Sequence, residues 1–176
     1  DQKKIAVFYA DDDFSVGAKD DLVAQLSRHG ITPVALTSYN RFTMDIVAAA
    51  DPLIQTDPKL VICIATSMPT VRLIKHFFER GHYATTFFGI DSTLFVGNIL
   101  QSKGIDFYYT SATPDPVASQ LSIARQYRED LKQYMPTETP NILSFTYYLS
   151  AAIIVDALKH YLSFYQRNLI SVSVPC

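Results

Sequence analysis

The sequence predicts an α/β protein built on a doubly wound, parallel five-stranded sheet, followed by two extra C-terminal helices. Two observations indicate this fold. Short apolar runs lack period-two alternation, which is typical of parallel strands covered by helices on both faces. Helical patterns separate each run from the next, and strands joined through helices favour a parallel sheet with right-handed crossovers.

The opening stretch shows this pattern most clearly. Apolar residues dominate positions 4–9, an acidic run follows at 11–13, and a helical pattern begins at Val16 and ends at His29-Gly30. Pro33 favours an edge position or a strand start for the second run, and Thr43 is a candidate N-cap of the second helix. The repeated alternation predicts further strands at 31–36, 59–64, 85–88 and 105–109, and further helices at 42–54, 71–80 and 94–102.

The character of the chain changes after Pro116. Two helices are predicted, over 117–134 and 142–165, with no strand between them. We therefore expect an α/β lobe over residues 1–116 and a C-terminal helical segment over residues 117–176. The sheet's own crossover helices already cover it, so the apolar faces of the last two helices require another partner. These faces include Tyr147, Tyr148, Ala151, Val155 and Leu158.

Composition excludes several classes of protein. The chain has 176 residues, of which 48% are hydrophobic and 18% charged, as in a globular domain. Its net charge of -2 and the lack of a basic stripe argue against a nucleic-acid partner. The apolar stretch 151–155 is broken by Asp156 and falls short of the roughly 18 residues of a membrane span. Cys63 lies within an apolar strand pattern, which predicts a core thiol.

In an open parallel sheet, ligands bind at the carboxyl ends of the strands. The loops that follow the predicted strands at this edge are 10–16, 65–69, 89–93 and 110–116. They carry the carboxylates Asp11, Asp12, Asp13, Asp91 and Asp115, the hydroxyls Ser15, Thr66, Ser67, Ser92 and Thr93, and the aromatic Phe14. The sequence therefore predicts a polar cleft with one stacking residue.

No catalytic or cofactor-binding motif emerges from these loops. The acidic run 11–13 could hold Mg²⁺ in a receiver-like domain. Such a domain also needs a phosphoryl-accepting carboxylate after the third strand and a lysine after the fifth, and both are missing here. A helix-capping turn is therefore favoured for 11–13. Gly17 is the one glycine in the first turn, which excludes the phosphate-cradling motifs. His29 and His82 flank helix-ending glycines, where capping is favoured over catalysis. We predict no enzyme activity, cofactor or metal, and keep a receiver-like signalling domain and a flavodoxin-like enzyme with an unrecognised site as alternatives.

Five stretches resemble a known family when taken in order. They read KIAVFYADDDFSVGAKDDLVAQL, SYNRFTMDI, DPKLVICIATSMPTVRLIKHFFERG, FFGIDST and SFTYYLSAAIIVDALKHY. Over residues 4–161 the chain resembles the second lobe of type I periplasmic binding proteins of the leucine/isoleucine/valine-binding kind, extracellular ligand-binding receptors, together with the final two helices. Such proteins trap a small solute between two lobes, for delivery to an ABC-transporter permease or for ligand sensing. The resemblance implies a periplasmic or extracellular protein, and a missing first lobe or another chain against the final two helices.

The resemblance also implies the residues of the ligand site. Phe14 matches an aromatic that lines the cleft, with packing against the first helix as the alternative. Thr66 and Ser67 fall where relatives present a second contact. Asp91, with Ser92 beside it, matches the acid that pairs with the ligand's ammonium group in amino-acid binders, the alternative being an N-cap of the next helix. The expected solute is amino-acid-like or amide-like.

Overall fold

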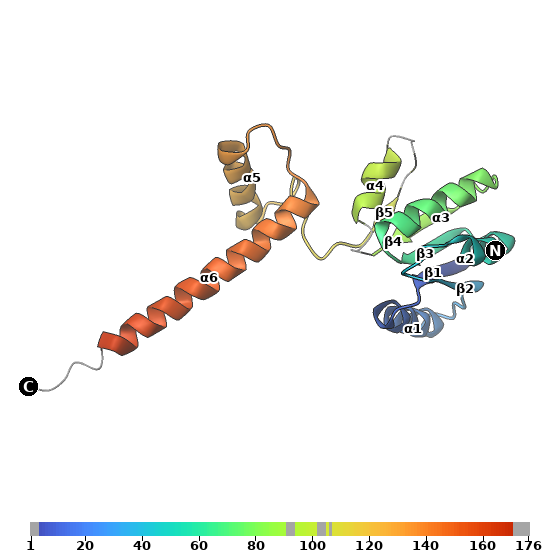
Figure 1. The fold of residues 1–176 in the computed structure, drawn as a ribbon, viewed down its shortest axis with the longest axis horizontal. Helices are drawn as coiled ribbons and strands as arrows, with labels where there is room; N and C mark the ends of the chain where they lie inside the picture. The colour runs from blue at the N-terminus through green and yellow to red at the C-terminus, as the bar shows by residue number, and fades with distance from the viewer. Residues whose placement is uncertain (1–3, 91–93, 102–104, 106, 171–176) are drawn as a thin grey trace, which may run out of the picture. The chain divides into compact units, whose positions relative to one another are not determined.

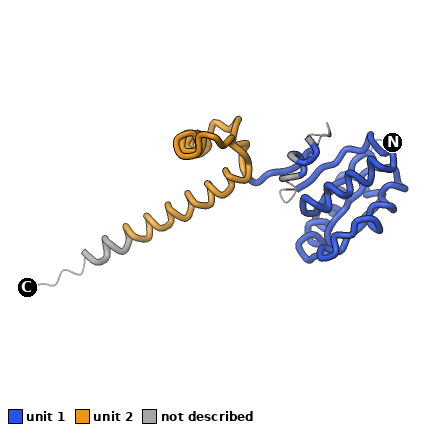
Figure 2. Tube along the Cα trace, turned by 45° about the horizontal axis from the view of Figure 1, so that its top comes forward, with its two compact units in different colours: residues 1–112 blue, residues 113–176 orange. Residues whose placement is uncertain are grey.

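A computed structural model of the protein describes residues 4–90, 94–101, 105 and 107–170. The chain forms two compact units, a sheet unit of residues 1–112 and a helical unit of residues 113–176 (Figure 2). The sheet unit contains β1 (Ile5–Ala10), α1 (Asp13–Arg28), β2 (Ala35–Tyr39), α2 (Val47–Gln55), β3 (Leu60–Ile64), α3 (Ser67–Glu79), β4 (Thr86–Gly89), α4 (Leu94–Gln101) and β5 (Tyr108–Tyr109) (Figure 1). The helical unit contains α5 (Ser122–Tyr134) and α6 (Ile142–Ile170).

The five strands form one parallel sheet in the order β2-β1-β3-β4-β5. This confirms the predicted α/β fold. β2 lies at an edge and begins just after Pro33, as proline's missing N–H favours. The chain runs from β1 to β2 on one side and then returns to β3 on the other. The topological switch point, where such sheets bind ligands, therefore lies between the carboxyl ends of β1 and β3.

The two faces of the sheet are buried unequally. Helices α3 and α4 lie on one side and α1 on the other (Figure 1), and α2 packs against α3. The α2–α4 side holds the main core, where one row across the sheet is buried: Ala6, Val61 and Phe87. On the α1 side Val7 and Ile64 are buried, while the row neighbours of Val7 are less so: Ile62 and Phe88 are half-buried and Tyr108 is exposed. A single helix thus covers only part of that face.

Several boundaries differ from the sequence predictions because side chains bind the backbone locally. α1 begins at Asp13, since the Asp12 carboxylate caps it. α2 begins at Val47 instead of residue 42, and Thr43 does not cap it. The amide nitrogens of Phe42 and Thr43 instead donate to the Asn40 side chain, each at 3.0 Å. An Asn side chain competes with helix formation in this way.

The later boundaries shift for similar reasons. β5 covers only Tyr108–Tyr109. α5 begins at Ser122 instead of residue 117. The Asp115 carboxylate accepts hydrogen bonds from the Val117 and Ala118 nitrogens, at 2.7 and 3.0 Å, which bends 115–118 into a turn. These two donors lower the pKa of Asp115, Ala118 having the larger effect.

The helical unit has a small core of its own. Its buried residues are Ala124, Tyr127 and Phe145, and the Tyr127 and Phe145 ring centroids lie 4.9 Å apart. The Tyr127 hydroxyl lies 2.5 Å from the Ser144 hydroxyl. The Tyr148 hydroxyl donates to Asp130 at 2.5 Å. Burial, and then this bond to a carboxylate, raise the pKa of Tyr148 to about 12.

The continuous length of α6 changes the expectation about membrane spans. The stretch Ile142–Ser163 has 22 residues and a mean hydropathy of 1.4, so it is long and apolar enough to cross a bilayer by length and composition. The expectation of no membrane span rested on residues 151–155 alone, which are too few to cross a bilayer. The stretch continues on both sides of it and includes Asp156 and Lys159. Only 6% of the window is buried in the structure. The same length and hydropathy occur in core helices of water-soluble proteins.

Candidate ligand-binding site

Three of the predicted site residues follow neighbouring strands. Phe14 is the second residue of α1, directly after β1. Thr66 is the N-cap residue of α3 and Ser67 its first residue, directly after β3. Since β1 and β3 pair in parallel, these loops lie beside each other at the switch point. Asp91 and Ser92 lie outside the described residues.

Phe14 presents its ring to solvent instead of to the core. Its side chain is 69% exposed. The backbone that carries it is fixed, because Asp12 caps the helix and Ser15 is buried. Met68, the second residue of α3, adds a half-exposed apolar side chain at the next loop. The switch point therefore offers apolar surface on a preformed backbone, in contrast to simple packing of Phe14 against α1.

The loop after β3 has a fixed main chain and an exposed hydroxyl. The Thr66 carbonyl accepts hydrogen bonds from the Thr70 nitrogen at 3.2 Å and from the Thr70 hydroxyl at 2.9 Å. The Thr66 backbone is extended, its side chain is exposed, and its hydroxyl makes no capping hydrogen bond to α3. Ser67 is half-buried. This loop can supply polar contacts to a small solute without rearranging its backbone.

The acidic run after β1 serves the structure of the edge. The Asp11 carboxylate accepts hydrogen bonds from the Asn40 side chain at 3.0 Å and from the Arg41 nitrogen at 2.9 Å. The Asp11 nitrogen donates to the Tyr39 carbonyl at 3.0 Å. Asp11 thus ties the end of β1 to the loop after β2. No group of three metal-ligating side chains gathers in the part of the chain that the structure describes.

Asp12 has two partners. One carboxylate oxygen accepts the Ser15 nitrogen at 2.8 Å, and the other pairs with the Arg41 guanidinium at 2.8 Å. The Ser15 backbone bond, followed by the Arg41 bond, lowers the pKa of Asp12. Asp12 therefore caps α1, as the sequence indicated. Its pairing with Arg41 was not predicted, because 29 residues separate the two and no local pattern joins them.

The loop of residues 40–46 is the feature that sequence reasoning missed most completely. Asn40 organises it from within: its side-chain oxygen accepts two backbone nitrogens, and its carbonyl accepts the Met44 nitrogen at 2.9 Å. Arg72 of α3 donates to the Met44 carbonyl at 3.1 Å. Phe42 stands at the tip of this loop with 91% of its side chain exposed. The second strand was predicted at 31–36, so the sequence analysis did not place Asn40 and Arg41 directly after a strand, as they are in the structure.

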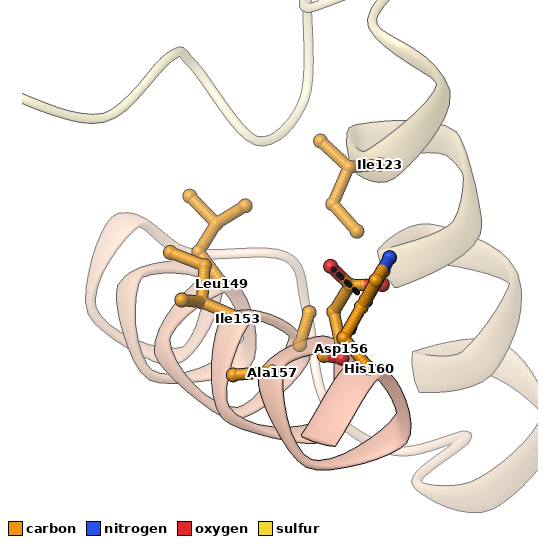
Figure 3. Close-up of a pocket in the computed structure, with 7 residues that line it drawn as sticks. Ile123, Leu149, Ile153, Asp156, Ala157 and His160 are labelled. Atoms are coloured by element: carbon orange, nitrogen blue, oxygen red, sulfur yellow. Dashed lines mark hydrogen bonds and ion pairs between the residues drawn. The ribbon is translucent and has the colours of Figure 1, made fainter. Parts of the chain in front are cut away.

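The helical unit contains an open, mostly apolar groove between α5 and α6. Its volume is about 580 Å³. Figure 3 shows Ile123 from α5 facing side chains from α6 across it. The lining residues from α6 are Leu149, Ala152, Ile153, Asp156, Ala157 and His160. Asp156 and His160 are the polar residues of the lining, and the His160 Nδ1 lies 3.5 Å from the Asp156 carboxylate. The other lining residues are apolar.

Comparison with known proteins places the chain in a family. The family profile described as periplasmic binding protein matches residues 1–171, so the chain belongs to the periplasmic binding protein family. The comparison with curated proteins yields no match. Solved structures of leucine/isoleucine/valine-binding-like proteins share the fold, and the sheet unit corresponds to one lobe of the type I fold.

Three of these structures show the degree of likeness. A possible leucine/isoleucine/valine-binding protein from Rhodopirellula baltica gives a TM-score of 0.77 at 22% identity, covering 89% of this chain and 44% of that one. A leucine-binding protein from Thermotoga maritima gives 0.72 at 17% identity, with coverage of 90% and 45%. A periplasmic ligand-binding protein of a branched-chain amino acid ABC transporter from Burkholderia xenovorans gives 0.60 at 14% identity, with coverage of 80% and 37%. The chain thus spans less than half the length of each.

Proposed function

We propose that this chain supplies the second lobe of a periplasmic or extracellular solute-binding protein that traps an amino-acid-like or amide-like solute without chemical conversion. The observation that carries the proposal is the carboxyl edge at the β1/β3 switch point. There the exposed Phe14 follows β1, and the exposed Thr66 follows the neighbouring strand β3. The backbones of both loops are fixed by hydrogen bonds. Family membership supports solute binding. Delivery to an ABC-transporter permease, or ligand sensing, is the proposed use of the bound solute.

Asp91 is the proposed electrostatic anchor for the solute's ammonium group. It follows the last residue of β4 by two positions. Asp11 and Asp12 are less suited, because they already accept hydrogen bonds from Asn40 and Arg41. In the sequence Asp91 is also separated from other acids, unlike the run 11–13.

The test is calorimetric titration of the full-length protein with L-leucine and the other proteinogenic amino acids. Asp91→Asn is expected to weaken binding of the preferred amino acid by roughly 30-fold or more, because the ligand's ammonium group loses its counter-charge in a closed cleft. Asp21→Asn, a matched change at an exposed position of α1, is expected to bind like the wild type. If Asp91 only caps the next helix, Asn replaces it well and affinity stays unchanged.

The helical unit is proposed to pack against the protein's first lobe. Ile153, Ile154 and Val155 are consecutive in α6 and all exposed. Since successive residues point about 100° apart around a helix, apolar surface extends over most of its circumference. A helix that is apolar all round is normally buried on more than one side. The first lobe of the same protein is the proposed cover.

A further inference from the structure

We propose that Phe42 is a lobe-closing contact, an aromatic side chain held at the rim of the ligand cleft that packs against the first lobe when the protein closes on its solute. The inference rests on the proposed two-lobed function. Phe42 is the most exposed large hydrophobic residue in the part of the chain that the structure describes, at 91%. Phe42 is not among the residues that form the core of the sheet unit.

The loop presents this ring on a backbone fixed from three directions. Asp11 accepts the Arg41 nitrogen and Asp12 binds the Arg41 guanidinium, which ties the loop to the end of β1. Asn40 binds the Phe42 nitrogen from within the loop. Arg72 anchors the far end of the loop to α3 through the Met44 carbonyl. A contact that is already ordered loses less entropy on association, so its apolar surface contributes more to binding.

The position of the Phe42 loop favours another part of the protein, not the solute, as what Phe42 contacts. Residues 40–46 follow β2, and Phe14 follows the adjacent strand β1 at the same edge of the sheet. A small solute at the switch point would lie between β1 and β3, on the side of β1 away from β2. Neighbouring strands are about 5 Å apart, so the solute would lie about one strand spacing from the Phe42 loop. Phe42 therefore stands outside the solute crevice, on its rim. The relatives are about twice as long as this chain, and the proposed first lobe would face this edge.

The experiment uses the full-length protein with L-leucine as the probe, and measures affinity, dissociation rate and radius of gyration. Phe42→Ala is expected to weaken binding roughly tenfold, as the loss of one buried aromatic contact implies. Faster dissociation and a larger radius of the leucine-bound form should accompany this loss. Phe42→Leu should restore most of the affinity. Because Phe42 is exposed, none of these variants should melt earlier than wild type without ligand.

Tyr83→Ala is the matched control. Tyr83 is also an exposed aromatic, at 69%, but it precedes β4 and so belongs to the opposite edge of the sheet. Its removal should leave leucine affinity and compaction unchanged. If Phe42→Ala behaves like Tyr83→Ala while Asp91→Asn weakens binding, the closing contact is wrong and the proposed function stands.

Two further outcomes are decisive. If Phe42→Ala weakens binding of leucine but not of alanine, Phe42 touches the solute's side chain, and the lobe contact is wrong. A contact between lobes should instead weaken all bound amino acids by a similar factor. If the wild-type protein binds no amino acid, the proposed function fails and the closing contact fails with it.

Discussion

At the scale of single residues, Asp12 connects the start of α1 to the loop after β2. One of its oxygens caps α1, and the other holds Arg41 at the base of the loop that carries Phe42. The cap was predictable because an acid directly before a helical pattern is a local signal. The ion pair was not, because its partner lies on a different loop and only the β1–β2 pairing brings the two together.

Substitution of Asp12 should separate these two roles. Asp12→Ala removes both and is expected to destabilise the protein by about 1 kcal/mol, whereas Asp12→Asn keeps a capping side chain and should cost less. The folded-state pKa of Asp12 is lowered, so its ionic contribution is present above the ordinary pKa of 3.8 and is lost as pH falls through the lower folded value. The stability difference between wild type and Asp12→Asn should therefore shrink below about pH 4.

Chemical denaturation at pH 7 and pH 3 checks this expectation. Asp21→Asn serves as the control, because Asp21 is an exposed acid in the same helix. A wild-type advantage over Asp12→Asn that persists undiminished at pH 3 would show that the carboxylate's charge is not what stabilises the fold.

At the scale of elements, the sequence predicted the strands better than the loops. Apolar runs predict strands of a parallel sheet without information from distant residues, and all five predicted strands overlap an observed one. The second was placed four residues too early, at 31–36 instead of Ala35–Tyr39, and the fifth too long, at 105–109 instead of Tyr108–Tyr109. The start of α2 was misplaced because Met44 fits helical spacing, yet its φ of 52° places it outside the helical region. The same error hid the Phe42 loop. Phe14, Thr66 and Ser67 could be assigned to one edge because strand direction alone determines where their loops lie.

The pairing of α5 with α6 should be separately stable from the sheet. Phe145 is fully buried in the helical unit, in a cluster of three buried residues. Phe145→Ala is expected to cost about 3–5 kcal/mol, because a cavity replaces the ring and the small core has few neighbours to refill it. Hydrogen exchange should then show lost protection in α5 and the first turns of α6, with β1 and β3 still protected.

Tyr147→Ala is the control on the same helix, because Tyr147 is exposed and its truncation leaves no cavity. Equal loss of protection in both units after Phe145→Ala would contradict the expectation, since it would mean that the units unfold as one.

At the scale of the whole molecule, the exposed apolar surface of α6 requires a partner that buries it. A bilayer could cover a helix of this length. However, Asp156 and Lys159 lie within the same stretch, and charged groups in a membrane span are costly. A protein surface can leave these side chains at its rim while it buries Ile153 and Ile154. The two charged residues therefore favour the proposed first lobe over a membrane as the cover.

The chain of residues 1–176 on its own should therefore self-associate and bind an apolar dye. Each 100 Å² of apolar surface removed from water contributes about 2.5 kcal/mol, so even partial covering of α6 drives association. Ile154→Lys should reduce both self-association and dye binding, whereas Ser150→Lys, at an exposed polar position of the same helix, should change neither. Sedimentation and dye titration measure these effects, and adding the first lobe in trans should abolish dye binding. Co-flotation of the chain with neutral phospholipid vesicles would instead favour a membrane as the cover, and a strict monomer without dye binding would remove the need for any partner.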